Sequence, residues 1–218
     1  MKFKRYLNEY SDDVLQKAAA VSSAIENENN GWYEKIRKDC KKYLNATKNS
    51  EHLLIRWEDR ATVSAYKKKV RKKRRPLDTP LVVHRYIDKI MKKKFGWRPR
   101  GSGLFCFSSS VQSSAFWVFP VGKFEFVYSN KIDDLTVHLA QAIGTGPTSM
   151  KYKFDEEKDM PVIKQSMDKA LKTYKNTNFR RCLELGTDME ISIRCDHAYL
   201  IKDSLPNIHR FIYKKEEK

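Results

Sequence analysis

The sequence lacks a long apolar run, and none of its 218 residues lies in a stretch that approaches the length of a membrane span. Its basic start, MKFKRYLNEYSDD, is not followed by an apolar segment, so we expect no signal peptide. The 40% of hydrophobic residues and 12% of aromatics are enough to build a core. We therefore expect a cytoplasmic protein with no membrane contact.

Cysteine is scarce and dispersed: Cys40, Cys106, Cys182 and Cys195 form no CxxC pair. A zinc site needs Cys and His ligands clustered at short spacing, and the run Cys195-Asp196-His197 has no second pair to complete it. We expect no metal, and we interpret the four cysteines as buried free thiols in a reducing cytoplasm.

Acidic residues are too few to balance the basic ones, and the formal net charge is +17. Most of this excess is diffuse, but one segment, KKKVRKKRRP at residues 67–76, is a true cluster. It could contact phosphate, RNA or an acidic partner protein, or it could be the solvated end of a helix. Its basic residues are Lys67, Lys68, Lys69, Arg71, Lys72, Lys73, Arg74 and Arg75.

Residues 1–76 read as helical. Apolar residues recur at helical spacing over residues 11–26, 32–44 and 51–74, and prolines at 76 and 80 end the last segment. Beyond residue 80 the pattern changes to short β-branched and aromatic runs, such as LVVHRYI, LFCFS, FWVFPVG, FEFVYS, MEISIRC and HAYLI, with helices at 131–143 and 159–175. The fold class is therefore α+β. We expect a basic helical region at 1–76 and an α+β domain at 77–218.

The least ordinary stretch is GSGLFCFSSSVQSSAFW at residues 101–117, which combines glycines, serines and aromatics. It is either a turn followed by an ordinary core strand, or the wall of a pocket. His84 and Arg85 precede it on a run that we predict to be a strand, and Glu190 opens a late strand. Buried charge is costly, so such residues on strands are candidates for a site.

The order of these motifs resembles the ADP-ribosyltransferase fold. GSGLFCFSSSVQSSAF is similar to the second motif of the diphtheria-toxin and poly-ADP-ribose-polymerase branch, and MEISIRCDHAYLI is similar to its glutamate strand. The resemblance covers roughly residues 80–202 and implies a split antiparallel β-sheet core. Small proteins of this general look also occur in bacteriophage genomes.

The resemblance implies an NAD site that needs no metal. Phe105 and Phe116 would stack on nicotinamide, Ser113 would bind its carboxamide, and His84 would hold the adenosine ribose. Glu190 would be the catalytic carboxylate, because loss of nicotinamide leaves positive charge on the ribose.

The arginine-type branch fits more loosely and stays open as an alternative. In that interpretation Arg85 would bind a phosphate of NAD, and Ser108, Ser109 and Ser110 would replace the usual Ser-Thr-Ser strand. Both interpretations share Glu190. Phenylalanine at 105 and 116, where tyrosine is common, departs from the polymerase branch and removes a hydroxyl group.

Two functions from different classes follow. The first is an NAD-dependent mono-ADP-ribosyltransferase that modifies a macromolecular target, in the host cytoplasm if a phage encodes it. The second is a basic nucleic-acid-binding or virion-associated phage protein without catalytic activity, which would bind through residues 67–75.

Overall fold

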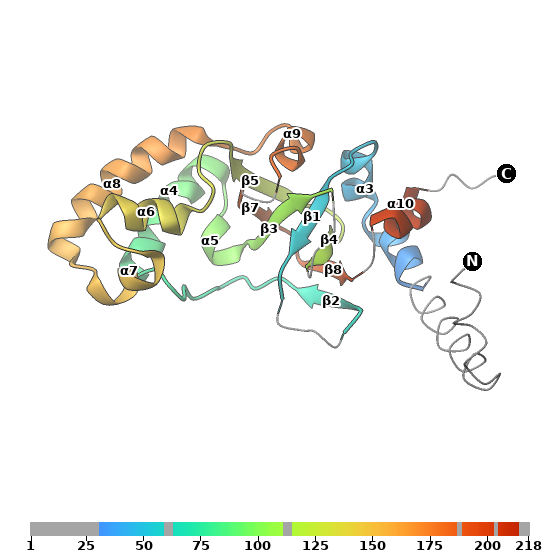
Figure 1. Cartoon of the computed structure of the whole chain (residues 1–218), viewed down its shortest axis with the longest axis horizontal. Helices are drawn as coiled ribbons and strands as arrows, with labels where there is room; N and C mark the ends of the chain where they lie inside the picture. The colour runs from blue at the N-terminus through green and yellow to red at the C-terminus, as the bar shows by residue number, and fades with distance from the viewer. Residues whose placement is uncertain (1–30, 59–62, 111–114, 187–188, 203–204, 214–218) are drawn as a thin grey trace, which may run out of the picture.

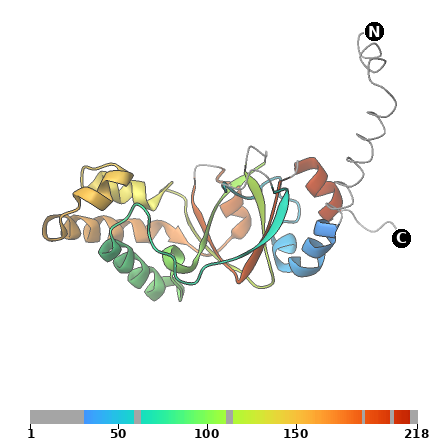
Figure 2. The same ribbon diagram turned by 90° about the horizontal axis from the view of Figure 1, so that it is seen from below.

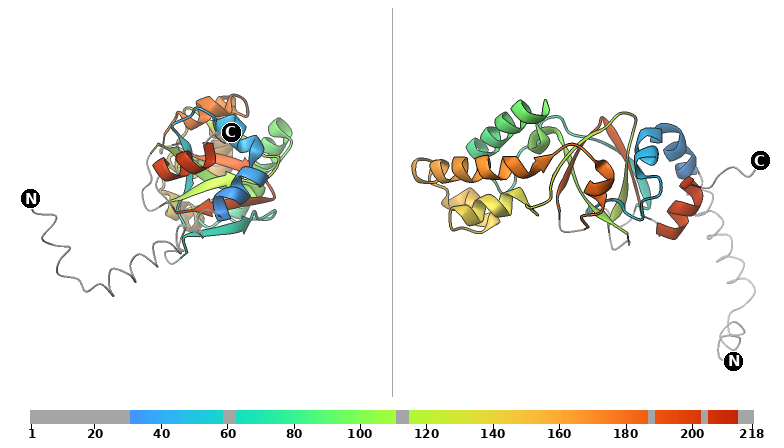
Figure 3. Two further views of the ribbon diagram at one scale, coloured as in Figure 1. Left: turned by 90° about the vertical axis from the view of Figure 1, so that its right-hand side faces the viewer. Right: turned by 90° about the horizontal axis from the view of Figure 1, so that it is seen from above.

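The computed structural model describes residues 31–58, 63–110, 115–186, 189–202 and 205–213. They form an elongated molecule in which a β-sheet lies between two groups of helices (Figure 1). The views from below and from above show the same three layers, with α4, α6, α7 and α8 at one end and α3 and α10 at the other (Figures 2 and 3). The fold class α+β is confirmed.

The eight strands are antiparallel and lie in the order β2-β8-β4-β1-β3-β7-β5-β6. Their bounds are β1 Leu53–Arg56, β2 Ala65–Lys69, β3 Leu104–Ser109, β4 Phe116–Pro120, β5 Glu125–Ser129, β6 Tyr174–Lys175, β7 Ile191–Arg194 and β8 His197–Ile201. Strands β1 and β2 precede residue 76 and all the others follow it, so both regions of the chain build one sheet.

Strand β3 joins the two halves of the sheet. Its second half pairs with β1 through Phe107↔Ile55, and its first half pairs with β7 through Cys106↔Ile191. Successive side chains of a strand point to opposite faces. Leu104, Cys106 and Ser108 are buried, whereas Phe105 and Phe107 on the other face are only half-buried.

One hydrophobic core lies between the sheet and the helices at residues 31–39, α3 (Lys41–Thr47), α9 (Phe179–Leu183) and α10 (Leu205–Tyr213). Its largest fully buried side chains include Trp117 and Tyr43. The Tyr43 hydroxyl accepts a hydrogen bond from the Leu54 amide at 3.0 Å, so the only polar atom of this side chain is satisfied.

The second core holds the other helical group together. It contains α4 (Leu81–Phe95), α6 (Leu135–Ala142) and α8 (Glu156–Thr173), with α5 (Pro99–Ser102) and α7 (Pro147–Lys153) beside them. Asp134 caps α6 and Asp155 caps α8 by accepting hydrogen bonds from first-turn amides. The helices that we predicted at 131–143 and 159–175 are confirmed.

The helix predicted over residues 51–74 is wrong, because this segment forms β1 and β2. Leu53, Leu54 and Ile55 are all buried in the middle of the sheet. A strand buried on both faces has consecutive apolar residues, which a short window does not distinguish from a buried helix. The basic residues Lys67–Lys69 consequently lie on an edge strand and not at a helix end.

The strand predicted for LVVHRYI is also wrong: these residues begin α4. Pro80 precedes the first turn, and Val83, Ile87 and Met91 recur every four residues and are buried. Gly96 ends the helix in the left-handed conformation, with φ of 80°. The β-branched pair Val82-Val83 suggested a strand, but the packing of this segment against α8 stabilises a helix.

Strands predicted from the runs after residue 100 are confirmed as β3, β4, β5, β7 and β8. The helix predicted over 11–26 lies outside the described residues. All four cysteines are free, with Cys40, Cys106 and Cys182 buried. Among the described helices none is both long and apolar enough to cross a membrane, and no metal-ligand cluster of three or more side chains occurs in the described ranges.

Candidate functional site

A cavity of about 250 Å³ opens where β1, β3, α4, α5 and α6 meet, and we call it the arginine cavity. Three arginines, Arg56, Arg74 and Arg100, come to it from three separate segments of the chain. The remaining lining residues are Pro76, Leu77, Asp78, Thr79, His84, Phe105, Phe107, Asp134, Thr136, Pro147 and Glu190.

Glu190 directly precedes β7 and is fixed at the base of this cavity. The Nη1 atom of Arg100 donates to its Oε1 at 3.0 Å, and only about a tenth of either side chain is exposed. Nη2 of Arg100 donates to the Thr136 hydroxyl, and the Glu190 amide donates to the Asp133 carbonyl at 2.9 Å. Burial raises the pKa of Glu190 above its ordinary value, and the Arg100 charge limits the rise.

The ring of Phe105 organises the arginines. The guanidinium carbon of Arg74 lies 4.3 Å from the ring centroid and that of Arg100 lies 4.7 Å from it. Arg56 donates a hydrogen bond from Nη1 to the carbonyl of the same residue. Burial lowers the pKa of Arg74, and the neighbouring charges of Arg56 and Arg100 lower it further. An anion in the cavity would relieve this repulsion.

His84 and Asp88 form a buried pair on the first turns of α4, with Nε2 and Oδ2 3.5 Å apart. The amides of Arg100 and Gly101 donate to Oδ1 of Asp88 at 3.2 and 3.1 Å. Burial lowers the pKa of His84 and raises that of Asp88, because it disfavours the charged form of each group. Because Asp88 accepts hydrogen bonds from these two amides, it docks α5, and with it Arg100, onto α4.

The close approach of Asp88 explains why position 101 is a glycine. A Cβ atom on it would lie 2.3 Å from Oδ2 of Asp88, closer than any real contact. Replacement by alanine is therefore expected to displace Asp88 from its two amide donors and to lower the free energy of unfolding by about 1–3 kcal/mol.

Urea unfolding of Gly101→Ala measures this effect. Gly146→Ala is the matched control, because nothing lies within 4 Å of a Cβ at that glycine. A Gly101→Ala variant as stable as Gly146→Ala would contradict the close approach of α5 to Asp88.

The structure brings together some of the predicted site residues. His84, Phe105 and Glu190 all line the arginine cavity, and so does Arg74 from the basic cluster. His84 reaches it from a helix, not from the strand on which we placed it. The histidine and glutamate motifs are thus close to the first half of the stretch at 101–117.

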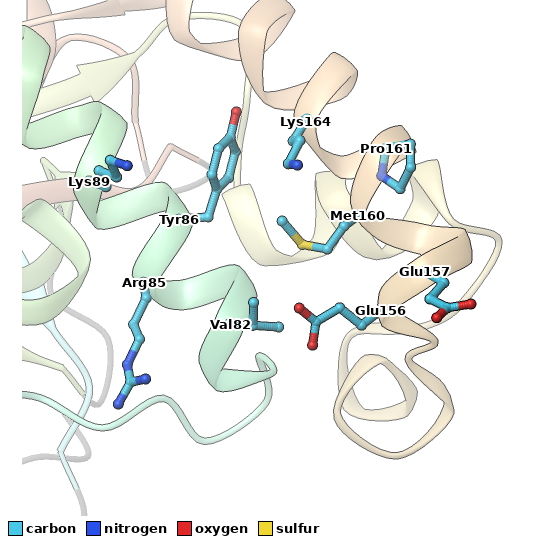
Figure 4. Close-up of a pocket in the computed structure, with 9 residues that line it drawn as sticks. All are labelled: Val82, Arg85, Tyr86, Lys89, Glu156, Glu157, Met160, Pro161 and Lys164. Atoms are coloured by element: carbon cyan, nitrogen blue, oxygen red, sulfur yellow. The ribbon is translucent and has the colours of Figure 1, made fainter.

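Other predicted residues lie elsewhere. Arg85 lines a separate hollow between α4 and α8, together with Glu156 and Glu157 (Figure 4). The Ser108 hydroxyl is on the opposite face of β3 and donates to the carbonyls of Leu183 and Gly186, so it holds the chain after α9 in place.

Ser109 is buried beside β1, and Ser110 follows it; neither of them lines the arginine cavity. Phe116, which we expected to stack on nicotinamide, is fully buried in β4 and does not line the arginine cavity. Ser113 lies outside the described residues.

Sequence reasoning missed Arg56, Arg100 and Phe107. Arg56 follows three buried residues of β1, and Arg100 lies in the run Trp97-Arg98-Pro99-Arg100. An arginine directly after a buried strand was the available signal for Arg56. Nothing in the local pattern of Arg100 indicated that it would meet Glu190.

Most of the basic cluster stays at the surface. Lys67, Lys69, Arg71, Lys72, Lys73 and Arg75 are exposed. Lys68 binds Glu58 at 2.7 Å, and Arg74 alone turns into the cavity. The cluster therefore does two things: it supplies one wall of the cavity and leaves a positive surface outside it.

Comparisons of the chain with family models, with curated proteins and with solved structures found no match.

Proposed function

We propose that the arginine cavity binds NAD and that the protein transfers its ADP-ribosyl group to a macromolecule. The observation that carries this proposal is the convergence of Glu190, Phe105 and His84 with three arginines in one cavity. These residues come from distant parts of the sequence, and the order of their motifs is the one that resembles ADP-ribosyltransferases. The antiparallel sheet, with β3 shared between its two halves, is compatible with the split core of that fold.

The arginines suit the pyrophosphate of NAD. A guanidinium group presents a planar fork of donors that matches phosphate oxygens. Arg56 comes from β1 and binds Glu58 through Nε. Arg74 comes from the segment after β2 and forms no ion pair with a carboxylate of the described residues. Burial and the neighbouring charges of Arg56 and Arg100 lower the pKa of Arg74, and these positive charges favour a dianionic ligand at this position.

The aromatic wall suits the nicotinamide ring. Two guanidinium groups already lie over the ring of Phe105, so Phe107 is the ring left for stacking on nicotinamide. The ring of Trp57 packs edge-on against Phe107, with centroids 5.2 Å apart, and supports it from outside. We therefore assign the stacking role that the sequence suggested for Phe116 to Phe107, because Phe116 is buried in the core.

In the reaction the bond between nicotinamide and ribose breaks, and its electron pair leaves with nicotinamide. The positive charge that develops on the ribose would be stabilised by the carboxylate of Glu190. Arg100 holds this carboxylate in one orientation and is itself held by a hydrogen bond that it donates to the Thr136 hydroxyl. A nucleophile of the target then bonds to the ribose carbon and loses its proton. No step needs a metal.

Arg74→Ala tests the binding half of this proposal. We expect NAD to raise the melting temperature of the native protein, and we expect the variant to bind NAD about ten- to a hundredfold more weakly, because a charge-assisted hydrogen bond is lost. Titration calorimetry and the NAD-dependent thermal shift measure the change.

Arg75→Ala is the matched control, since Arg75 is the adjacent residue and is exposed outside the cavity. It removes the same charge from the chain and should leave NAD affinity unchanged. Absence of any NAD-dependent thermal shift in the native protein, or an equal loss in both variants, would contradict the proposal.

A further inference from the structure

A second depression, which we call the basic groove, lies beyond the arginine cavity along the segment after β2. It measures about 720 Å³ and is bounded by the end of α4, the β4–β5 turn and the β7–β8 turn. Its charged lining consists of Lys42, Lys72, Lys92, Arg98, Lys123 and Arg194 with Glu125 and Asp196.

The positive charge of this groove is largely uncompensated. Its two carboxylates are already engaged, since Glu125 binds Arg194 at 2.7 Å and Asp196 lies 3.4 Å from Lys72. Lys42, Lys92 and Lys123 are exposed and form no ion pair with any described residue. Six cationic groups against two carboxylates leave a net charge of +4 on the lining.

The basic cluster extends this charge along the edge of the sheet. The amide of Val70 donates to the carbonyl of Asp196 at 3.0 Å, which fixes the segment beside the β7–β8 turn. Lys67 and Lys69, on β2, and Arg71 are exposed and lead up to the groove. The result is a stripe of positive charge, which is the electrostatic footprint of a nucleic-acid-binding surface.

We propose that the basic groove and this stripe bind the sugar-phosphate backbone of single-stranded nucleic acid. The uncompensated groups are mostly lysines, which bind phosphate as point charges, whereas the fork of Arg194, which would suit a carboxylate of an acidic protein, is occupied by Glu125. The groove, at about 720 Å³, is too small to enclose a duplex, whereas a short stretch of one strand fits in it.

Recognition at this surface is independent of base sequence. Trp97 is the tryptophan of the lining, and only 4% of its surface is exposed, so it offers no platform on which a base could stack. Phe124 packs against Tyr43 and Phe179 and is also engaged. Phosphate contacts alone then supply the affinity, and these are strongly dependent on salt.

The test is the binding of a fluorescein-labelled oligothymidylate, followed by anisotropy as a function of salt concentration. The triple variant Lys42→Gln, Lys92→Gln, Lys123→Gln removes three unpaired charges of the groove. We expect its affinity to fall by at least about tenfold, and the slope of log K against log salt to become shallower by about 2, since each phosphate contact of a single strand contributes about 0.7.

The matched control neutralises Lys153, Lys158 and Lys164, which are exposed on α7 and α8 and line no part of the groove. An equal loss in this variant would show attraction to overall charge and would overturn the proposal. So would equally tight binding of a duplex, or competition by polyglutamate as effective as that by unlabelled oligothymidylate.

This inference does not depend on the proposed enzymatic function. The binding is measured without NAD, and none of the substituted residues lines the arginine cavity. A protein that binds the oligonucleotide but not NAD would contradict the proposed function alone. A protein whose melting temperature rises with NAD but that does not bind the oligonucleotide would contradict only the proposal that the basic groove binds nucleic acid.

Discussion

Glu190→Gln is expected to slow both NAD hydrolysis and ADP-ribosyl transfer by about 10²–10³-fold, the usual cost of removing one electrostatic contact to a developing charge. Glutamine preserves the shape of the side chain and can still accept a hydrogen bond from Arg100. It lacks the negative charge that would stabilise the ribosyl cation, so the affinity for NAD should change far less than the rate. Release of labelled nicotinamide and labelling of proteins in a cell extract measure the two activities.

Glu184→Gln is the control for this substitution. Glu184 also binds an arginine, Arg181 at 3.2 Å, but on the surface at the end of α9. It should keep full activity. A Glu190→Gln protein that is folded, binds NAD and turns it over at the rate of the native protein would disprove the catalytic role of Glu190.

Arg100→Met is expected to lower the free energy of unfolding by about 3–5 kcal/mol at neutral pH, because it leaves the buried Glu190 carboxylate without its partner. Methionine keeps much of the volume and the contact with Phe105, so the loss is mainly electrostatic. This change would also separate α5 from Thr136, to which Arg100 donates a hydrogen bond. Chemical denaturation at several pH values measures the loss.

The loss in Arg100→Met should shrink as the pH falls. Burial already raises the pKa of Glu190, and removal of the arginine charge raises it further. A carboxyl group whose pKa is higher in the folded state binds its proton more tightly there, so stability falls as the pH rises through the folded pKa. The variant should therefore regain stability from neutral pH towards about pH 5.

The double variant Arg100→Met, Glu190→Gln serves as the reference for this effect. It contains no buried carboxylate at position 190, and over the same pH range it should lack the gain in stability of the single variant. If both variants respond to pH alike, the gain does not come from Glu190. If the single variant is as stable as the native protein at neutral pH, the buried pair is not the support of the cavity that its geometry suggests.

Local patterns were sufficient for much of the secondary structure. The helix predicted over 159–175 corresponds to α8, and short β-branched and aromatic runs predict β3, β4, β5, β7 and β8. Two segments were misread for the same reason. Leu53–Ile55 and Val82–Val83 are apolar runs whose conformation depends on what covers them, and the sequence does not contain that information locally.

Only those residues of the candidate site that belong to the ordered motifs of the resemblance could be predicted from the sequence. Glu190, His84 and Phe105 were named from the sequence, and all three line the cavity. Arg56 was hidden in a segment predicted as helix, and Arg100 reaches Glu190 only because α5 docks on Asp88. Ser108 and Ser109 were named from the resemblance to the arginine-type branch, but the alternation of β3 and its pairing with β1 place them among buried groups.

The topology of the sheet also determines when its strands can pair during synthesis of the chain. Strand β2 pairs with β8 and with no other described strand, although most of the chain separates them. Until the ribosome has released β8, β2 has no partner in the sheet, although the Arg74 amide that follows it can already bind the Gly101 carbonyl. Pairing across so many residues is slow, because the entropy of closing the loop is lost before the contacts form. The edge of the sheet is thus completed late, and a chain truncated before β8 would contain the glutamate but not the pairing that holds β2.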